Sequence, residues 1–203
     1  MIRLLDPRSI LKASFLYNFY QKLVGGVRAR RLFITKDVNI NPNQKILDIG
    51  CGPGYIIDFL PEVNYTGFDI DPNYIETAKK TYPDKSFTCS SIETFHIEDP
   101  HTFDVVICAG VLHHLNDEEA STLFKLAKQA LKPEGRLLTF DGCYVKNQNP
   151  VAKKLLDLDR GKYVRTKSEY LRITKQHFSN IETKIDTNYF HIPYTSIVIK
   201  SFN

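Results

Sequence analysis

The sequence predicts an α/β fold built around a mostly parallel, doubly wound sheet with helices on both faces. Strand-like and helix-like segments alternate from residue 45 to residue 141, an order that indicates parallel strands joined by helical crossovers. Residues 103–108, Phe-Asp-Val-Val-Ile-Cys, are nearly all apolar, as a central strand covered on both faces must be. Residues 46–54 run from an apolar strand directly into three glycines, so we also expect a ligand at the carboxyl end of the sheet.

Composition limits the class of protein. The chain has 203 residues, of which 42% are hydrophobic and 25% charged, and this fits one globular domain. Its net charge of +4 is mild and its basic residues cluster only at 28–31, so a nucleic-acid partner is not indicated. No apolar run approaches the roughly 18 to 20 residues that span a bilayer, and no signal peptide is recognisable. We therefore expect a cytoplasmic protein without a transmembrane segment.

Cysteine usage agrees with that location. The four cysteines show no C-x-x-C spacing, which argues against a zinc site or a disulfide framework. The sequence therefore predicts no metal ion.

The first 44 residues are treated as an N-terminal helical cap on a main domain of residues 45–203. Asp6-Pro7 starts a helix with a broad apolar face, and Gly25-Gly26 ends it. We expect this helix to cover the ligand site as a lid. Two alternatives stay open: simple packing on the sheet, and attachment to a membrane surface.

The glycine turn after the first strand is the strongest local motif. Asp48 precedes Gly50, Gly52 and Gly54, which read G-x-G-x-G. Glycine allows positive φ and a close approach of backbone N–H groups to a ligand. A dinucleotide fingerprint would read G-x-G-x-x-G and bind a pyrophosphate, so the spacing here favours a ligand without phosphates. A purely structural tight turn is the alternative.

An acidic residue ends the second strand. The short strand 65–68 leads into Asp69, about 20 residues beyond the glycines, where a carboxylate can accept both hydroxyls of a ribose. Asp71 before Pro72 is instead typical of a helix N-cap, and we expect that helix over residues 72–82.

Two further segments complete the pattern. A third strand leads into a polar turn within residues 87–93, and the fourth strand is followed by Ala-Gly-Val-Leu-His-His-Leu at 109–115 and a capped helix over 117–131. Across residues 46–140 these motifs resemble the class I S-adenosylmethionine-dependent methyltransferases, and within them the type 11 small-molecule group. The resemblance implies a Rossmann-like sheet of seven strands whose last strand runs antiparallel, with S-adenosylmethionine as the cofactor.

The resemblance also implies which residues bind the cofactor. Ser91 and Ile92 are expected at the adenine, since Ser90 stands where the family usually has Asp. The backbone of Ala109 and Gly110 is expected along the methionine part. The implied cofactor-binding set is Asp48, Gly50, Cys51, Gly52, Gly54, Asp69, Ile70, Ser91, Ile92, Ala109 and Gly110.

The implied reaction is methyl transfer to oxygen or nitrogen of a small molecule such as a sugar, a lipid or a secondary metabolite. We predict His113 as the general base, because it follows the fourth strand towards the methyl group and its ordinary pKa suits proton transfer. Packing alone is the alternative for His113. Two other functions stay open. One is a nucleic-acid (RNA) methyltransferase, although enzymes acting on adenine N6 or on cytosine normally have an Asn/Asp-Pro-Pro-aromatic or Pro-Cys motif where this chain has residues 109–112. The other is a non-catalytic cofactor-binding module.

The remaining sequence predicts an insertion and the end of the sheet. Residues 142–178 form the insertion on the substrate side, with a helix opened by Asn149-Pro150 and a second helix opened by Thr166. Strands are expected at about 181–189 and 194–202.

Substrate-binding residues are predicted mainly in this insertion. Arg160 and Arg165 could hold a carboxylate or phosphate, and Tyr163, with Tyr194 further on, could stack on a ring or sugar. A solvated surface loop is an equal alternative. Neither the acceptor nor the oligomeric state follows from the sequence.

Overall fold

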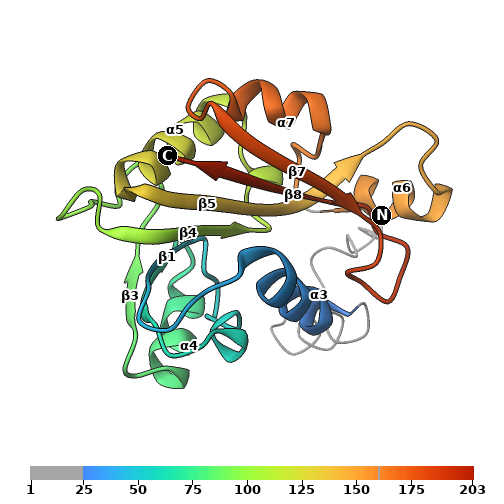
Figure 1. The fold of residues 1–203 in the computed structure, drawn as a ribbon. Helices are drawn as coiled ribbons and strands as arrows, with labels where there is room; N and C mark the ends of the chain where they lie inside the picture. The colour runs from blue at the N-terminus through green and yellow to red at the C-terminus, as the bar shows by residue number, and fades with distance from the viewer. Residues whose placement is uncertain (1–24, 160) are drawn as a thin grey trace, which may run out of the picture.

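The fold is a seven-stranded sheet in the order β3-β2-β1-β4-β5-β8-β7, seen in a computed structural model that describes residues 25–159 and 161–203 (Figure 1). Strands β3, β2, β1, β4 and β5 are mutually parallel, and β8 is antiparallel to both β5 and β7. This confirms the predicted Rossmann-like sheet and its antiparallel last strand. The strands are β1 Lys45–Ile49, β2 Asn64–Asp69, β3 Ser86–Cys89, β4 Phe103–Ala109, β5 Leu131–Tyr144, β7 Asn180–Asp186 and β8 Ser196–Phe202.

A further short strand was not predicted. Strand β6, Arg165–Thr166, pairs in parallel with the last residues of β5. It exists because β5 runs on to Tyr144, past the end of β4, and so offers a free edge to the insertion.

Helices cover both faces of the sheet (Figure 1). One face carries α3 and α4, and the other carries α5 and α7. Between β5 and β6, α6 lies near the end of β5. The helices are α3 Gly26–Leu32, which continues into the π-helical η1 Phe33–Val38, then α4 Pro72–Thr81, α5 Asp117–Ala130, α6 Pro150–Asp157 and α7 Lys167–Thr174, with short 3₁₀ turns η2 Ile57–Phe59 and η3 Leu112–His114.

Alternate residues of the central strands enter two separate cores. In β4, Val106 and Cys108 join the cluster beneath α5 and α7, while Val105 and Ile107 join the cluster beneath α3, η1 and α4. Side chains alternate across a strand, so both faces of β4 are buried. This is why residues 105–108 of β4 are all apolar.

Capping residues start the helices as the sequence predicts. Asp71 accepts from the N–H of Asn73 at 2.8 Å at the start of α4. Complete capping boxes open α5, with Asn116 and Glu119, and α7, with Thr166 and Glu169. One predicted boundary differs by three residues: β7 ends at Asp186 and not at 189, because the Asp186 carboxylate accepts from the N–H of Asn188 and turns the chain.

The predicted N-terminal cap is described only in part. The helix predicted between Asp6 and Gly25 lies outside the described residues, apart from its end. After it, Phe33, Ile34 and Val38 of η1 are buried in the core cluster on the α3 side. Within residues 25–44, η1 therefore packs on one face of the sheet. That residues 1–44 form a separate cap stays a prediction.

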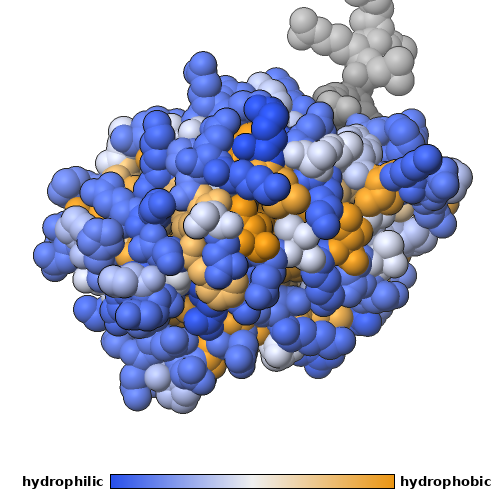
Figure 2. All heavy atoms as spheres, turned by 45° about the horizontal axis from the view of Figure 1, so that its top comes forward, coloured by the Kyte–Doolittle hydropathy of each residue, from blue (hydrophilic) through white to orange (hydrophobic). Residues whose placement is uncertain are grey.

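The surface is predominantly hydrophilic on the face shown in Figure 2, where hydrophobic residues show in several areas separated by hydrophilic ones. Among residues 25–159 and 161–203, no helix has the length and apolar character needed to cross a bilayer.

Candidate cofactor and acceptor site

The glycine turn after β1 adopts the backbone conformation that its sequence predicts. Gly50, Gly52 and Gly54 all have positive φ, at 70°, 54° and 78°. A β-carbon on Gly50 would lie 2.5 Å from Val111 Cγ2, whereas one on Gly52 would have no atom within 4 Å. The turn therefore needs glycine for its shape, and it leaves open space over Gly52.

Asp69, at the end of β2, is tied to this turn. Its Oδ2 accepts from the N–H of Gly52 and its Oδ1 from the N–H of Asp71, both at 2.9 Å. A carboxylate has about four acceptor positions, so Asp69 keeps capacity for two further donors. The next residue, Ile70, is 73% exposed and offers an apolar side chain beside that carboxylate.

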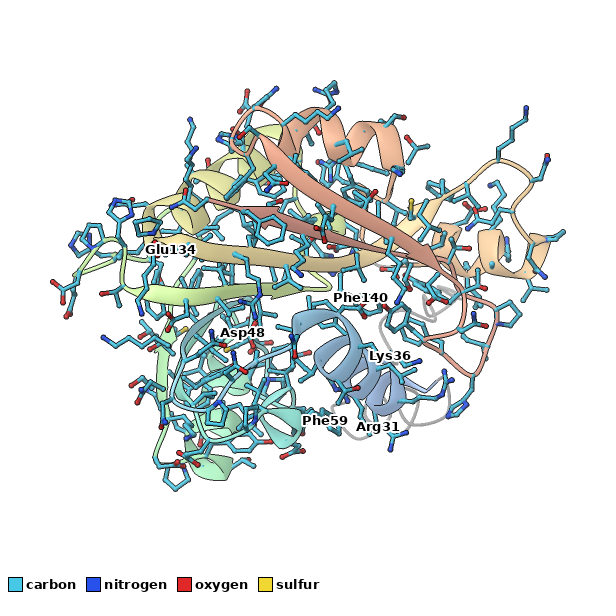
Figure 3. The ribbon with its side chains drawn as sticks, viewed as in Figure 1. Arg31, Lys36, Asp48, Phe59, Glu134 and Phe140 are labelled. Atoms are coloured by element: carbon cyan, nitrogen blue, oxygen red, sulfur yellow. The ribbon has the colours of Figure 1, made fainter. Side chains whose placement is uncertain are left out.

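Asp48 is a buried carboxyl group within the same edge, in the interior of the molecule (Figure 3). Burial raises its pKa to about 7, although a 2.6 Å hydrogen bond from the Tyr65 hydroxyl lowers it and Asp69 raises it further. Cys51 lies beside these groups and is half-buried. Gly67 makes room for it, because a β-carbon there would lie 2.9 Å from Cys51 Sγ.

The turn after β3 is held next to Asp69. The N–H of Ser90 donates to the Asp69 carbonyl at 3.0 Å, and the N–H of Ser91 donates to Thr94 Oγ1 at 3.1 Å. Ile92 packs, partly buried, against the core beneath α5. The residues predicted at adenine thus stand next to the carboxylate predicted at the ribose.

The end of β4 leads from this edge to a histidine. Ala109 is half-buried, and Gly110 has a φ of 76° and donates its N–H to the Phe140 carbonyl at 2.7 Å. A β-carbon on Gly110 would lie 3.9 Å from Cε1 of His113. His113, on η3, is therefore next to the backbone predicted for the methionine part.

His113 is buried, 8% exposed, and lies between two aspartates that the sequence did not indicate. Its Nδ1 is 2.8 Å from Asp141 Oδ1, and its Nε2 is 3.4 Å from Asp159 Oδ1. Burial alone lowers the pKa of His113, but the hydrogen bonds to Asp141 and Asp159 outweigh it and raise the pKa to about 10. Although burial raises the pKa of Asp159, its bond to His113 lowers that pKa to about 2.

The segment that carries Asp159 lies directly on His113. A β-carbon on Gly161 would lie 2.1 Å from His113 Cδ2, so this contact requires glycine. The N–H of Tyr163 donates to the His113 carbonyl at 2.9 Å, and the Tyr194 hydroxyl donates to Asp159 Oδ2 at 3.1 Å. The only signal for Asp159 in the sequence is Asp followed by Gly two residues on, which predicts a turn and no site.

An open pocket of about 450 Å³ adjoins the segment. Asp159 forms part of its wall, so the pocket reaches the group that faces His113. It is lined by Tyr144, Leu156, Asp157, Asp159, Gly161, Lys162 and Val164.

Known proteins share both sequence and fold with this chain. A family model described as a methyltransferase domain matches residues 46–135. Phosphoethanolamine N-methyltransferase 1 of Zea mays is 31% identical over 64% of this chain and 30% of its own length. Ubiquinone biosynthesis O-methyltransferase of Idiomarina loihiensis is 32% identical over 65% of this chain and 59% of its own length. The solved phosphoethanolamine N-methyltransferase 2 of Haemonchus contortus, in complex with phosphomonomethylethanolamine and S-adenosylhomocysteine, has the same fold, with a TM-score of 0.71 at 16% identity over 100% of this chain and 61% of that one.

The chain matches a methyltransferase domain over residues 46–135, and these comparisons of sequence and fold support a class I S-adenosylmethionine-dependent methyltransferase. It spans less than two thirds of the length of the two curated relatives named above. The narrower assignment to the type 11 group stays a prediction.

The predicted substrate residues of this chain lie in different surroundings. Arg165 is 6% exposed and donates to the carbonyls of Leu112 and Leu115 and to Asp117. Its guanidinium is paired within the chain, to η3 and to the first residue of α5, so these contacts do not support a role in substrate binding, which stays a prediction. Tyr163 is 39% exposed, with the Arg165 guanidinium 5.8 Å from its ring centroid, while Arg160 lies outside the described residues.

Proposed function

We propose that this chain binds S-adenosylmethionine across the carboxyl ends of β1, β2 and β4 and transfers its methyl group to a small molecule. The observation that supports this best is the pairing of Asp69 with Gly52. The carboxylate is fixed at the turn, keeps acceptor capacity for a ribose diol, and faces the open space over Gly52. No phosphate is needed to explain either feature.

The cofactor's orientation follows from the same edge. Ile70, Ser91 and Ile92 would surround the adenine, while the turn at residues 50–54 and the backbone of 109–110 would hold the methionine part. The sulfonium methyl supplies the group to be transferred. The chain's own contribution is to fix the cofactor and to exclude water around the acceptor.

His113 is our candidate for the residue nearest the transferred methyl. A general base needs a free nitrogen lone pair, and a pKa of about 10 leaves His113 protonated at neutral pH. The surroundings therefore support a positioning role for His113 at the acceptor side better than the base role predicted from the sequence.

A small-molecule acceptor agrees with the names of the relatives that match this chain. The matched relatives are named as a phosphoethanolamine N-methyltransferase, a ubiquinone biosynthesis O-methyltransferase and a malonyl-[acyl-carrier protein] O-methyltransferase. The pocket beside Asp159, with Tyr163 and Tyr194 nearby, is where we place the acceptor. Cytoplasmic location is part of the same proposal, supported by four free cysteines.

Calorimetric titration with S-adenosylhomocysteine tests the cofactor half of this proposal. We expect saturable one-to-one binding by the wild-type chain, and a loss of more than about 100-fold in Gly52→Val, because a β-branched side chain suits neither the positive φ nor the ligand's space. Circular dichroism checks that the variant is folded. No binding by folded wild-type protein would reject the proposal.

The acceptor half needs a separate experiment. The chain is incubated with methyl-labelled S-adenosylmethionine and a cell extract, which is then divided into small-molecule, lipid, protein and RNA fractions. We expect label in the small-molecule or lipid fraction. Label found only in RNA would reject the small-molecule acceptor in favour of RNA, and it would leave the assignment of S-adenosylmethionine as cofactor unchanged.

A further inference from the structure

Three metal-binding side chains meet beside η3. His113 and His114 are consecutive on this turn, and Asp159 approaches from the insertion; one ligand atom from each lies within 4.8 Å of the others. His113 Nε2 and Asp159 Oδ1 are 3.4 Å apart. This is long for a hydrogen bond, but two ligands bound tetrahedrally to one Zn²⁺ at 2.0–2.1 Å stand about 3.3 to 3.4 Å apart.

Asp141 holds the first of these ligands in the orientation that a metal site needs. Its Oδ1 is 2.8 Å from His113 Nδ1 and the residue is 3% exposed. When the Nδ1–H donates to a carboxylate, the Nε2 lone pair points the other way, here towards Asp159. Carboxylate groups commonly fix metal-bound histidines in this manner.

The cluster is reachable from solvent. His114 is exposed, its ring centroid is 4.2 Å from that of His113, and Asp159 lines the open pocket of about 450 Å³. The two aspartates supply negative charge for a divalent cation. His113 also adjoins Gly110, so the cluster stands between the proposed cofactor site and the pocket.

We propose that His113, His114 and Asp159 bind a divalent transition-metal ion such as Zn²⁺, with Asp141 as the positioning residue for His113. The ion takes the place of the proton between His113 Nε2 and Asp159. Two imidazoles and one carboxylate are a donor set that zinc and similar metals prefer, and three protein ligands leave an open position.

The open position on the ion could bind the methyl acceptor, a role that rests on the proposed function. An acceptor hydroxyl bound there loses its proton to solvent more readily. The oxygen then forms a bond to the methyl carbon while the carbon–sulfur bond breaks and its electron pair returns to sulfur. Such a site favours acceptors with a free hydroxyl group.

Metal binding itself is tested without the cofactor. Tag-free protein is freed of metal with a chelator and titrated with Zn²⁺ by calorimetry and with Co²⁺ by visible absorption. We expect one ion per chain and a Co²⁺ spectrum of low coordination number. His114→Ala and Asp159→Asn should each weaken binding at least tenfold, and Asp141→Asn by about 10- to 100-fold.

Matched variants separate this site from surface binding. Asp157→Asn changes a carboxylate that lines the same pocket but pairs with Lys153, and His96→Ala removes an exposed histidine elsewhere; both should bind as the wild type does. Absence of saturable binding, or equal affinities in His114→Ala, Asp159→Asn and the wild type, would overturn the proposal. S-adenosylhomocysteine titrations of the same samples show whether the chain binds this ligand independently of the metal ion, so the cofactor proposal and the metal proposal are tested separately.

Discussion

The two edges of the site are built in different ways. The central part of the cofactor edge joins residues 48–71, which are close in sequence, through backbone turns and one carboxylate, Asp69. The acceptor edge joins His113, Asp141 and Asp159, which come from η3, β5 and the insertion. The first edge is shaped by local backbone geometry and the second by long-range ion pairs. We therefore expect changes at the first edge to affect ligand affinity, and changes at the second to affect the fold of the insertion.

The largest expected effect is the pH dependence that Asp48 gives to the unfolding free energy. Observing it would show that the cofactor edge affects stability as well as ligand affinity. Burial raises the pKa of Asp48 to about 7, so the folded state holds a proton between pH 4 and 7 that the unfolded state has lost. The contribution of Asp48 to the unfolding free energy is therefore highest below about pH 4, falls as pH rises from 4 to 7, and stays at its lower value above pH 7. At about 1.4 kcal/mol per pKa unit, the loss is on the order of 4 kcal/mol.

The Asp48→Asn variant removes this proton equilibrium. In urea unfolding of the ligand-free protein at several pH values, the difference in unfolding free energy between wild type and variant should change across pH 4 to 7 and stay level above it. A difference that is constant with pH would mean that Asp48 is ionised in the folded protein at acidic pH.

Arg165 gives the next largest effect, on the acceptor edge. Arg165→Met leaves the carbonyls of Leu112 and Leu115 without their donors, at about 1 to 3 kcal/mol for each buried group. We expect a loss of about 3 kcal/mol, or roughly 6 to 12 °C in Tm for a chain of this size. Affinity for S-adenosylhomocysteine should not change.

Arg172→Met is the matched control. Arg172 pairs with the same Asp117 but is 57% exposed, and exposed ion pairs contribute about 1 kcal/mol or less. Equal losses in the two variants would show that the bond to Asp117, and not the burial of Arg165 against η3, is what matters.

The contrast between the edges explains what the sequence could predict. The positions of Gly50, Gly52 and Gly54 indicate their own backbone conformation, and the alternation of strand and helix segments predicts a parallel sheet whose carboxyl edge holds Asp69 near them. Nothing near Asp141 or Asp159 in the sequence indicates that both meet His113, because a strand and an insertion bring them together over 28 and 46 positions. The burial of Arg165 was not predictable for the same reason: in a polar segment it reads as a surface cation, yet its guanidinium pairs with Leu112, Leu115 and Asp117.

Asp69→Ala tests the cofactor edge directly. The substitution removes the acceptor proposed for two ribose hydroxyls, and we expect affinity for S-adenosylhomocysteine to fall by about 2 to 3 kcal/mol, or about 30- to 150-fold. Asp71→Ala is the control, since that side chain caps α4 and should cost about 1 kcal/mol of stability without changing affinity. Unchanged calorimetric affinity in Asp69→Ala would remove the ribose assignment.

The smallest effect is a difference in the alkylation rates of two cysteines. Cys89 is exposed at the end of β3, whereas Cys51 is half-buried in the glycine turn. Burial, followed by the charges of Asp48 and Asp69, raises the pKa of the Cys51 thiol well above its usual range, and alkylation requires the thiolate. Iodoacetamide should therefore modify Cys89 first.

Because Cys51 adjoins the proposed methionine site, saturating S-adenosylhomocysteine should slow the alkylation of Cys51 severalfold and change that of Cys89 less, as followed by mass spectrometry of the digested protein. In protein shown to bind the ligand, an unchanged Cys51 rate would place the methionine part away from this turn, and the two edges would then not share one ligand as proposed.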